Sequence, residues 1–318
     1  MRPIRSTLVL SLFALSLLVA ACGDDPTVTP TVSGPATTGP STSFPVTITD
    51  DDGESVTIDA PPQRIVTFAP SMTEIVFALG LGDKLVGVSG AFDDYPPEAA
   101  DIEEVGGAGD FGVDPNIEQV VGLEPDLFLT IKGGDQWKRR LRDLDVPVVT
   151  LDATNHDDLM DDIEVAGQIT GAEDAATATV DDLQAQADEV ESAIAGTPRV
   201  TCFYETFYPP LYTVGPDTFI YDLLERAGCD PVTSSAGQQY PQWSVEDLVD
   251  QSPDVYLVSS ESGAGPKAVA KRPGFEAISA VAAGRVVAID SSLAERPGPR
   301  IVEGLRLIAE ALHPEAFD

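Results

Sequence analysis

The sequence predicts an α/β protein with two similar lobes, each built on a mainly parallel sheet and joined by a long α-helix. Short apolar segments alternate with helical segments from Arg64 to about residue 152, and the alternation resumes at Arg199. Alternating strands and helices indicate βα units on a parallel sheet. Between the two stretches, residues 181–194 are strong helix formers that end at Gly196 and Pro198. One rigid helical connector is therefore expected between two lobes.

The first lobe begins with a predicted β-hairpin, because Asp51-Asp52-Gly53 separates two short alternating segments. The remaining strands of this lobe are expected at 64–68, 84–88, 126–130 and 146–151, with helices at 71–79, 117–121 and 136–144. In the second lobe we expect strands at 200–204, 254–258 and 285–289, with helices at 218–227, 245–250 and 299–312.

The two lobes share a short internal repeat. Residues 117–130 and 245–258 align without a gap, each with an apolar-Glu pair, a later Pro-Asp and an apolar strand. Asn116 and Ser244 are predicted N-caps, with Gln119 and Asp247 three residues further on, as in a capping box. Glu118 and Glu246 therefore occupy equivalent first-turn positions, one in each lobe.

The N-terminus predicts export and lipid anchoring. A basic start and an apolar run from Leu8 to Ala21 are typical of a signal peptide. The segment Val19-Ala20-Ala21-Cys22 resembles a bacterial lipobox, in which the cysteine is acylated; an ordinary signal peptide is the alternative. The predicted organisation is a signal peptide (1–21), a Thr/Pro/Ser/Gly tether (22–45), an N-terminal α/β lobe (46–155), a connecting helical segment (156–198) and a C-terminal α/β lobe (199–318).

Composition excludes several classes of function. Eighteen Lys and Arg against 53 Asp and Glu give a net charge of −35, which argues against a nucleic-acid partner. Two histidines and three cysteines do not suffice for a typical multi-His or multi-Cys metal centre. In an oxidising compartment Cys202 and Cys229 can form a disulfide, although two buried thiols are an equal alternative.

Several motifs resemble the helical-backbone substrate-binding proteins of ABC transporters, a family that includes cobalamin, haem and ferric-siderophore receptors. The resemblance covers about residues 62–317 and rests on the opening segment 62–88, Asp94-Tyr-Pro-Pro97, the segment 217–228, and Arg296-Pro-Gly-Pro-Arg300 with the residues after it. The last motif is most similar to the cobalamin-binding branch. The resemblance implies a ligand cleft between two lobes and little hinge closure.

The resemblance also implies site residues. Aromatic rings that stack on a flat ligand correspond to Phe92 and Phe111 in the first lobe and to Tyr204 and Tyr240 in the second. Arg296 corresponds to a polar ligand contact. Glu118 and Glu246 match the residues that dock on a permease dimer and its ATPase; the alternative is that each only complements its helix dipole.

The sequence thus predicts a monomeric, membrane-anchored receptor outside the cytoplasm that captures cobalamin or a related corrinoid and is not an enzyme. A ferric-siderophore or haem receptor is the alternative, and an anchored enzyme on the same scaffold is a further one. No catalytic residue, metal site or resident cofactor is predicted. We interpret His156 and His313 as surface or capping residues, the Asp runs at 50–52 and 157–162 as solvated faces, and the Gly107–Gly112 segment as a loop rather than a nucleotide-binding turn.

Overall fold

The computed structural model describes residues 43–90, 92–106 and 114–317. The predicted signal peptide, Cys22, most of the tether, Phe111 and the Gly107–Gly112 segment lie outside the described residues. In the part of the chain that is described, no helix has the length and apolar character needed to cross a membrane.

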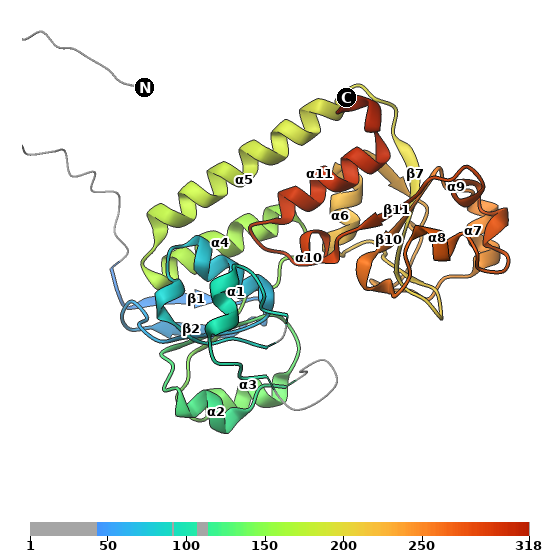
Figure 1. Ribbon diagram of the computed structural model, residues 1–318. Helices are drawn as coiled ribbons and strands as arrows, with labels where there is room; N and C mark the ends of the chain where they lie inside the picture. The colour runs from blue at the N-terminus through green and yellow to red at the C-terminus, as the bar shows by residue number, and fades with distance from the viewer. Residues whose placement is uncertain (1–42, 91, 107–113, 318) are drawn as a thin grey trace, which may run out of the picture. The chain divides into compact units, whose positions relative to one another are not determined.

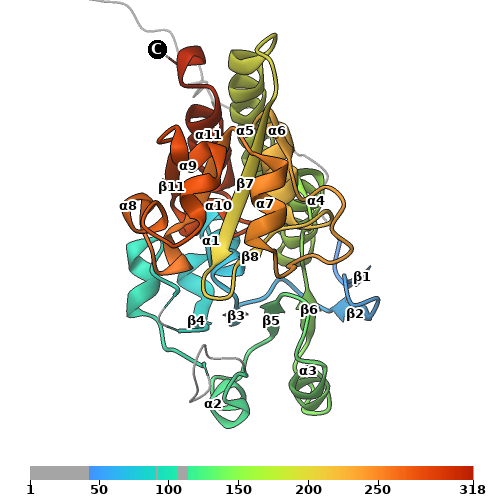
Figure 2. The same ribbon diagram turned by 90° about the vertical axis from the view of Figure 1, so that its right-hand side faces the viewer.

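The N-terminal lobe contains a four-stranded parallel sheet in the order β4-β3-β5-β6 (Figure 2). The two central strands are buried at every position, as expected for continuous apolar segments in a parallel sheet covered on both faces. The elements of this lobe are β3 (Ile65–Phe68), α1 (Pro70–Ala78), β4 (Leu85–Gly87), α2 (Ile117–Gly122), β5 (Leu127–Thr130), α3 (Asp135–Arg142) and β6 (Val148–Thr150).

The predicted hairpin is confirmed as the antiparallel pair β1 (Val46–Thr49) and β2 (Ser55–Ile58). Asp51 and Asp52 in its turn are exposed, as predicted for a solvated acidic face, but Asp50 is only 5% exposed. The Asp50 carboxylate accepts hydrogen bonds from the backbone N–H of Glu54 (2.9 Å) and of Thr150 (3.1 Å). Asp50 therefore fixes the turn and attaches the hairpin to the sheet.

Two helices form the connecting segment. α4 (His156–Thr170) ends at Gly171, whose φ of 74° suits glycine, and α5 (Glu173–Ile194) follows with 22 residues. α5 packs beside both α4 and the C-terminal helix α11 (Ile301–Leu312; Figure 1). Its buried residues recur at helical spacing and belong to the main hydrophobic core, which includes residues of both lobes. The buried residues of α5 are Ala176, Val180, Leu183, Ala187, Val190 and Ile194.

The C-terminal lobe contains a second sheet in the order β11-β10-β7-β8, with β9 paired to β7. All of these pairings are parallel except that of β8 with β7. The sequence did not predict β8 and β9. The elements are β7 (Val200–Phe207), β8 (Tyr212–Thr213), α6 (Phe219–Arg226), β9 (Cys229–Pro231), α7 (Val245–Gln251), β10 (Val255–Ser259), α8 (Pro266–Val269), α9 (Ser279–Ala282), β11 (Val286–Ile289), α10 (Ser291–Ala294) and α11.

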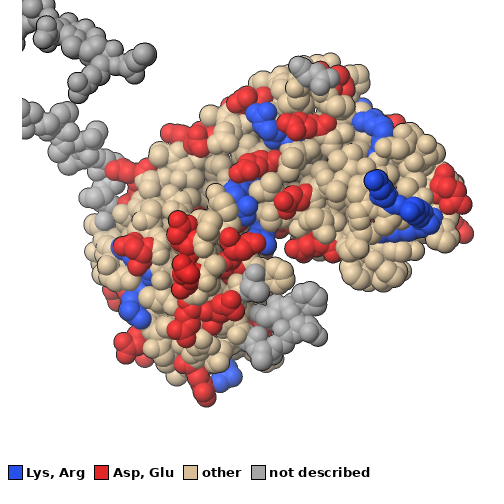
Figure 3. Space-filling view, viewed as in Figure 1, with Lys and Arg blue, Asp and Glu red and all other residues tan. Residues whose placement is uncertain are grey.

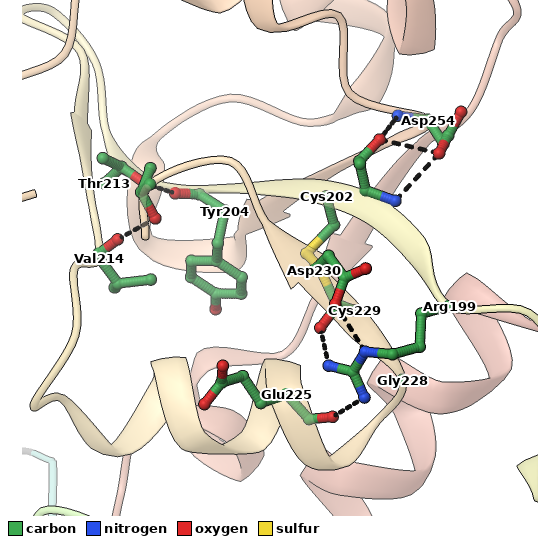
Figure 4. The surroundings of a disulfide bond; sticks show 12 residues. Arg199, Cys202, Tyr204, Thr213, Val214, Glu225, Gly228, Cys229, Asp230 and Asp254 are labelled. Carbon is green, nitrogen blue, oxygen red and sulfur yellow. Dashed lines mark hydrogen bonds and ion pairs between the residues drawn. A yellow bond between two sulfur atoms is a disulfide. The ribbon is translucent and has the colours of Figure 1, made fainter. Parts of the chain in front are cut away.

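Cys202 and Cys229 form a disulfide that joins β7 to β9, with the two Cα atoms 5.8 Å apart (Figure 4). This decides between the two alternatives that the sequence left open. The parallel register places Val200 opposite Cys229, so the strand pairing brings the cysteines within reach of each other. Arg199 reinforces the same corner by donating from Nε to Asp230 (2.6 Å) and from Nη1 to the Glu225 carbonyl (3.1 Å).

Candidate ligand-binding site

A cavity of about 140 Å³ is lined by residues of both lobes. The N-terminal residues follow directly on the carboxyl ends of the parallel strands β3, β5 and β6, where ligands bind in open α/β sheets. On the face shown in Figure 3 the surface is hollowed between the two lobes, and acidic side chains are spread widely over it. The lining residues are Ala69, Pro70, Ser71, Met72, Ile131, Leu151, Asp152, Ala153, Glu295, Arg296 and Pro297.

A larger depression of about 860 Å³ lies against α5 and the start of α11. Among the described residues, no strand end contributes to its walls, and neither Phe92, Tyr204 nor Tyr240 lines it. The buried carboxylate of Glu74 forms two hydrogen bonds there with Arg300 (2.6 and 2.9 Å), and the Arg300 guanidinium lies 3.9 Å from the centroid of the Tyr95 ring. This ion pair ties the C-terminal lobe to α1 and was missed in the sequence, although both residues lie within the motifs that carry the resemblance.

Tyr204 does not line the cavity, which corrects the prediction made for it. Its ring is 1% exposed and belongs to the main hydrophobic core. Its hydroxyl donates to Glu295 Oε1 at 2.8 Å, and Glu295 is a cavity residue. Burial raises the pKa of Tyr204 well above its ordinary value, so the hydroxyl remains a donor. Tyr204 therefore lies in the core and holds the cavity residue Glu295 through a hydrogen bond.

Glu295 was not predicted as a site residue. Burial raises the pKa of its carboxyl group, and hydrogen bonds from Ser259 and Tyr204 act in the opposite direction. Its position next to the predicted Arg296 is the only sequence signal that could have indicated it. The carboxylate is thus held by two hydroxyl groups at the wall of the cavity.

Arg296 lines the cavity, and its guanidinium also pairs across the lobes. Nη1 lies 3.1 Å from Asp94 Oδ1, and 15% of the arginine side chain is exposed. The charge of Arg296 is therefore already balanced by the carboxylate of Asp94, a residue of the N-terminal lobe. A role in ligand contact stays a prediction.

The other predicted aromatic contacts that the structure describes, Phe92 and Tyr240, are both exposed, at 51% and 55%. Although the residue as a whole is exposed, its hydroxyl is partly shielded from water, which raises the pKa of Tyr240, and the charges of Glu295 and Asp152 raise it further. Both rings are available to a ligand, and their contact with one stays a prediction.

The model of the periplasmic binding protein family matches residues 65–293. The chain belongs to this family. It is 35% identical over 284 residues to an uncharacterized ABC transporter substrate-binding lipoprotein of Bacillus subtilis, covering 86% of this chain and 87% of that one. It is also 35% identical to the cobalamin-binding protein of Halobacterium salinarum over 85% of this chain and 75% of that one.

A solved structure gives the same fold. The ABC-type Fe3+-hydroxamate transport system of Saccharomonospora viridis superimposes with a TM-score of 0.70 and 27% identity, over 86% of this chain and 99% of that one. The predicted α/β fold, with two lobes and mainly parallel sheets, is confirmed. Proteins of this family bind and transport substrates.

In this periplasmic binding protein the two predicted docking glutamates are exposed in the first turns of α2 and α7. The predicted N-caps are confirmed, because Asn116 accepts from the Gln119 N–H and Ser244 accepts from the Glu246 and Asp247 N–H groups. The capping box at α2 is not formed. The Gln119 side chain donates instead to Glu103 (2.9 Å) and to the Glu104 carbonyl (2.8 Å).

Both histidines of this periplasmic binding protein are buried, so neither lies on the surface, but His313 is the C-cap of α11, as the capping alternative predicted. His313, 1% exposed, has Nε2 3.3 Å from the Gly228 carbonyl. His156 is 3% exposed, and burial lowers its pKa, which keeps the ring neutral. Among the residues that the structure describes, no group of three or more His, Cys, Asp or Glu side chains could hold a metal ion.

Asp162 also contradicts the prediction of a solvated acidic face. It is 6% exposed on α4. Burial raises the pKa of its carboxyl group to about 8, with a further contribution from the charges of Asp51, Asp158 and Asp152. Asp162 is therefore largely protonated at neutral pH.

Proposed function

We propose that this protein is the substrate-binding component of an ABC importer that captures cobalamin or a related corrinoid outside the cytoplasm. The supporting observation is a mainly apolar cavity with a few charged side chains at the strand ends, lined by both lobes, in a chain 35% identical to a cobalamin-binding protein. The small cavity would form the floor of the site. Phe92 and Tyr240, with their exposed rings, would contact the flat corrin above it.

Titration of the purified full-length protein with cobalamin, haem and ferric siderophores tests this proposal. We expect one cobalamin per chain and quenching of tryptophan fluorescence, mainly from the half-buried Trp243, because Trp137 is buried in the N-terminal core. Tyr240→Ala should weaken cobalamin binding about tenfold or more, as expected for loss of a stacked ring. Leu144→Ala is the matched control, because Leu144 is 51% exposed and lies away from the cavity lining. Failure of cobalamin to bind would refute the corrinoid assignment.

A ferric-hydroxamate complex is the second candidate, supported by the solved structure from Saccharomonospora viridis. Haem is the weaker form of this alternative, because both histidines that could ligate its iron are buried. In the same titration, saturable binding of a ferric hydroxamate without binding of cobalamin would favour this candidate. We propose no catalytic activity, and recovery of the ligand unchanged after prolonged incubation is the expected result.

Delivery to the permease and its ATPase is proposed to use Glu118 and Glu246, which are exposed at the starts of equivalent helices. Attachment to the membrane is proposed through a lipid on Cys22 of a monomeric protein. Cys22→Ala should release the protein from the membrane fraction, whereas retention there would argue against the lipid anchor.

A further inference from the structure

The charges around the cavity suggest a rule for its ligand. Asp152 is accompanied by Lys132, with Nζ 3.9 Å from Oδ2, and Arg296 is paired with Asp94 at 3.1 Å. In each of these two pairs, the positive and the negative charge cancel. The remaining carboxylate of the cavity lining is Glu295.

Glu295 is held by neutral groups. Its hydrogen bonds come from the hydroxyls of Tyr204 and Ser259, and its charged neighbour is another carboxylate, Glu261. No Lys or Arg of the described residues forms an ion pair with it; the nearest in sequence, Arg296, pairs with Asp94. A negative charge without a cationic partner is therefore left at the wall of the cavity.

The two residues whose hydroxyl groups hold Glu295 are fully buried. Tyr204 and Ser259 are 1% and 0% exposed, on the adjacent strands β7 and β10. The Ser259 Oγ accepts from the Glu261 N–H at 3.2 Å, which leaves its own proton for Glu295. Since the two hydroxyls use only part of the acceptor capacity of the carboxylate, the rest can accept hydrogen bonds from a ligand.

We propose that Glu295 makes this site selective for neutral or cationic ligands that present N–H or O–H donors, and that it rejects ligands presenting carboxylates or other anionic groups at the cavity. This inference rests on the proposed receptor function and narrows its ligand class. A donor group on the ligand would form a charge-assisted hydrogen bond with Glu295. An anionic group would meet an unbalanced like charge in a partly desolvated site.

This rule separates the candidate chelates by the charge of the groups that they present. The rim of a corrinoid carries primary amides, which donate hydrogen bonds and have no charge. Haem presents two propionates, and a ferric tricatecholate carries several negative charges. A ferric trihydroxamate is neutral or cationic and would be accepted. The preferred ligands are thus amide-rich corrinoids and trihydroxamates.

Ligands of nearly identical shape test the rule. We would measure dissociation constants of the full-length protein for cyanocobalamin and for its b, d and e monocarboxylates, in each of which one amide is replaced by a carboxylate. We expect at least one monocarboxylate to bind the wild-type protein more than tenfold more weakly than cyanocobalamin. In Glu295→Gln, whose amide oxygen can still accept from Tyr204, this ratio should fall to within about threefold.

Glu164→Gln removes one exposed carboxylate from α4, away from the cavity, and should leave the ratio unchanged. The wild-type ratio alone can overturn the inference, so the result does not depend on the folding of a variant. Binding of all three monocarboxylates within threefold of cyanocobalamin, or an unchanged ratio in a folded Glu295→Gln protein, would overturn it.

The same measurements separate this inference from the proposed function. If no corrinoid binds, the corrinoid assignment fails, and a ferric trihydroxamate is compared with a ferric tricatecholate instead. Tighter binding of the trihydroxamate would support the charge rule, and tighter binding of the tricatecholate would overturn it. Binding of none of these ligands would overturn both proposals.

Discussion

Two buried carboxylates, one on β7 of the C-terminal lobe and one on α4, are accommodated in opposite ways. Glu205 is 0% exposed and pairs with Arg272 through two hydrogen bonds of 2.5 and 2.8 Å. Asp162 is 6% exposed, its charged neighbours are carboxylates, and its pKa is raised to about 8. Because an unpaired charge in the core is costly, Glu205 is held by a cationic partner and Asp162 by its raised pKa. The comparison predicts opposite responses to mutation at the two positions.

The largest loss of stability is expected for Arg272→Met, which leaves Glu205 buried without its partner. Loss of one member of a buried ion pair typically costs about 3–5 kcal/mol of the free energy of unfolding. Urea denaturation measures it. Arg272→Met/Glu205→Gln should recover a large part of the loss, since the double variant removes the unpaired charge. A loss below about 1 kcal/mol in the single variant would show that Glu205 does not depend on the arginine.

A second difference between the lobes is the disulfide, which only the C-terminal sheet contains among the described residues. Its cysteines are 27 residues apart, and closing a loop of this size stabilises a protein by about 2–4 kcal/mol. Cys202→Ser/Cys229→Ser should lose this amount in denaturant titrations. A reductant should destabilise the wild-type protein and leave the double variant unchanged. Equal sensitivity of both proteins to the reductant would contradict this assignment.

Asp162→Asn should have the opposite sign to Arg272→Met. The folded-state pKa of about 8 lies above the unfolded value near 3.8, so the folded state binds more protons and loses stability as pH rises between these values. The asparagine variant should therefore be more stable than the wild type, by about 5 kcal/mol above pH 8, with the difference disappearing below about pH 4. Thermal unfolding across this pH range measures it. A pH-independent difference would show that Asp162 is ionised in the folded state.

The sequence located most elements of the fold, but it did not show which acidic side chains are buried. Hydrophobic alternation and helix caps located most strands and helices of the two lobes to within a few residues, because those signals are local. In the connecting segment, α5 begins eight residues before the predicted 181–194, and α4 was not recognised as a separate helix. The two-residue strand β8 and the three-residue β9, which contains Pro231, carry too little pattern to be recognised. Asp162 stands in an acidic run, and nothing in that run indicates which carboxyl group the tertiary packing buries.

The candidate site was harder to predict than the fold. Residues 202–205 of β7 are all buried, so the period-two pattern that separates a cavity face from a core face is absent there. Tyr204 was assigned to the ligand from the resemblance, and the strand offers no alternation that would have placed its ring in the core, where it supports Glu295. Glu295 and Arg296 are adjacent, and only the fold shows that the arginine is already paired across the lobes.

The smallest effect on stability is expected where the lobes are most alike, at Glu118 and Glu246. A first-turn glutamate interacts with its helix dipole by only about 0.3–1 kcal/mol, so each Glu→Ala variant should unfold within about 1 kcal/mol of the wild type. If both residues also dock on the permease, the double variant Glu118→Lys/Glu246→Lys should keep its ligand affinity and lose uptake in cells.

Asp247→Lys is the matched control for this uptake experiment, because Asp247 is exposed in the same turn of α7 as Glu246. Its uptake should remain near the wild-type rate. Equal loss of uptake in Asp247→Lys would attribute the effect to surface charge in general, and normal uptake in the double variant would leave both glutamates with a helix-capping role alone. The single variants refine the comparison, since two equivalent lobes should give similar losses, whereas an unequal loss would identify the lobe that binds the permease more strongly.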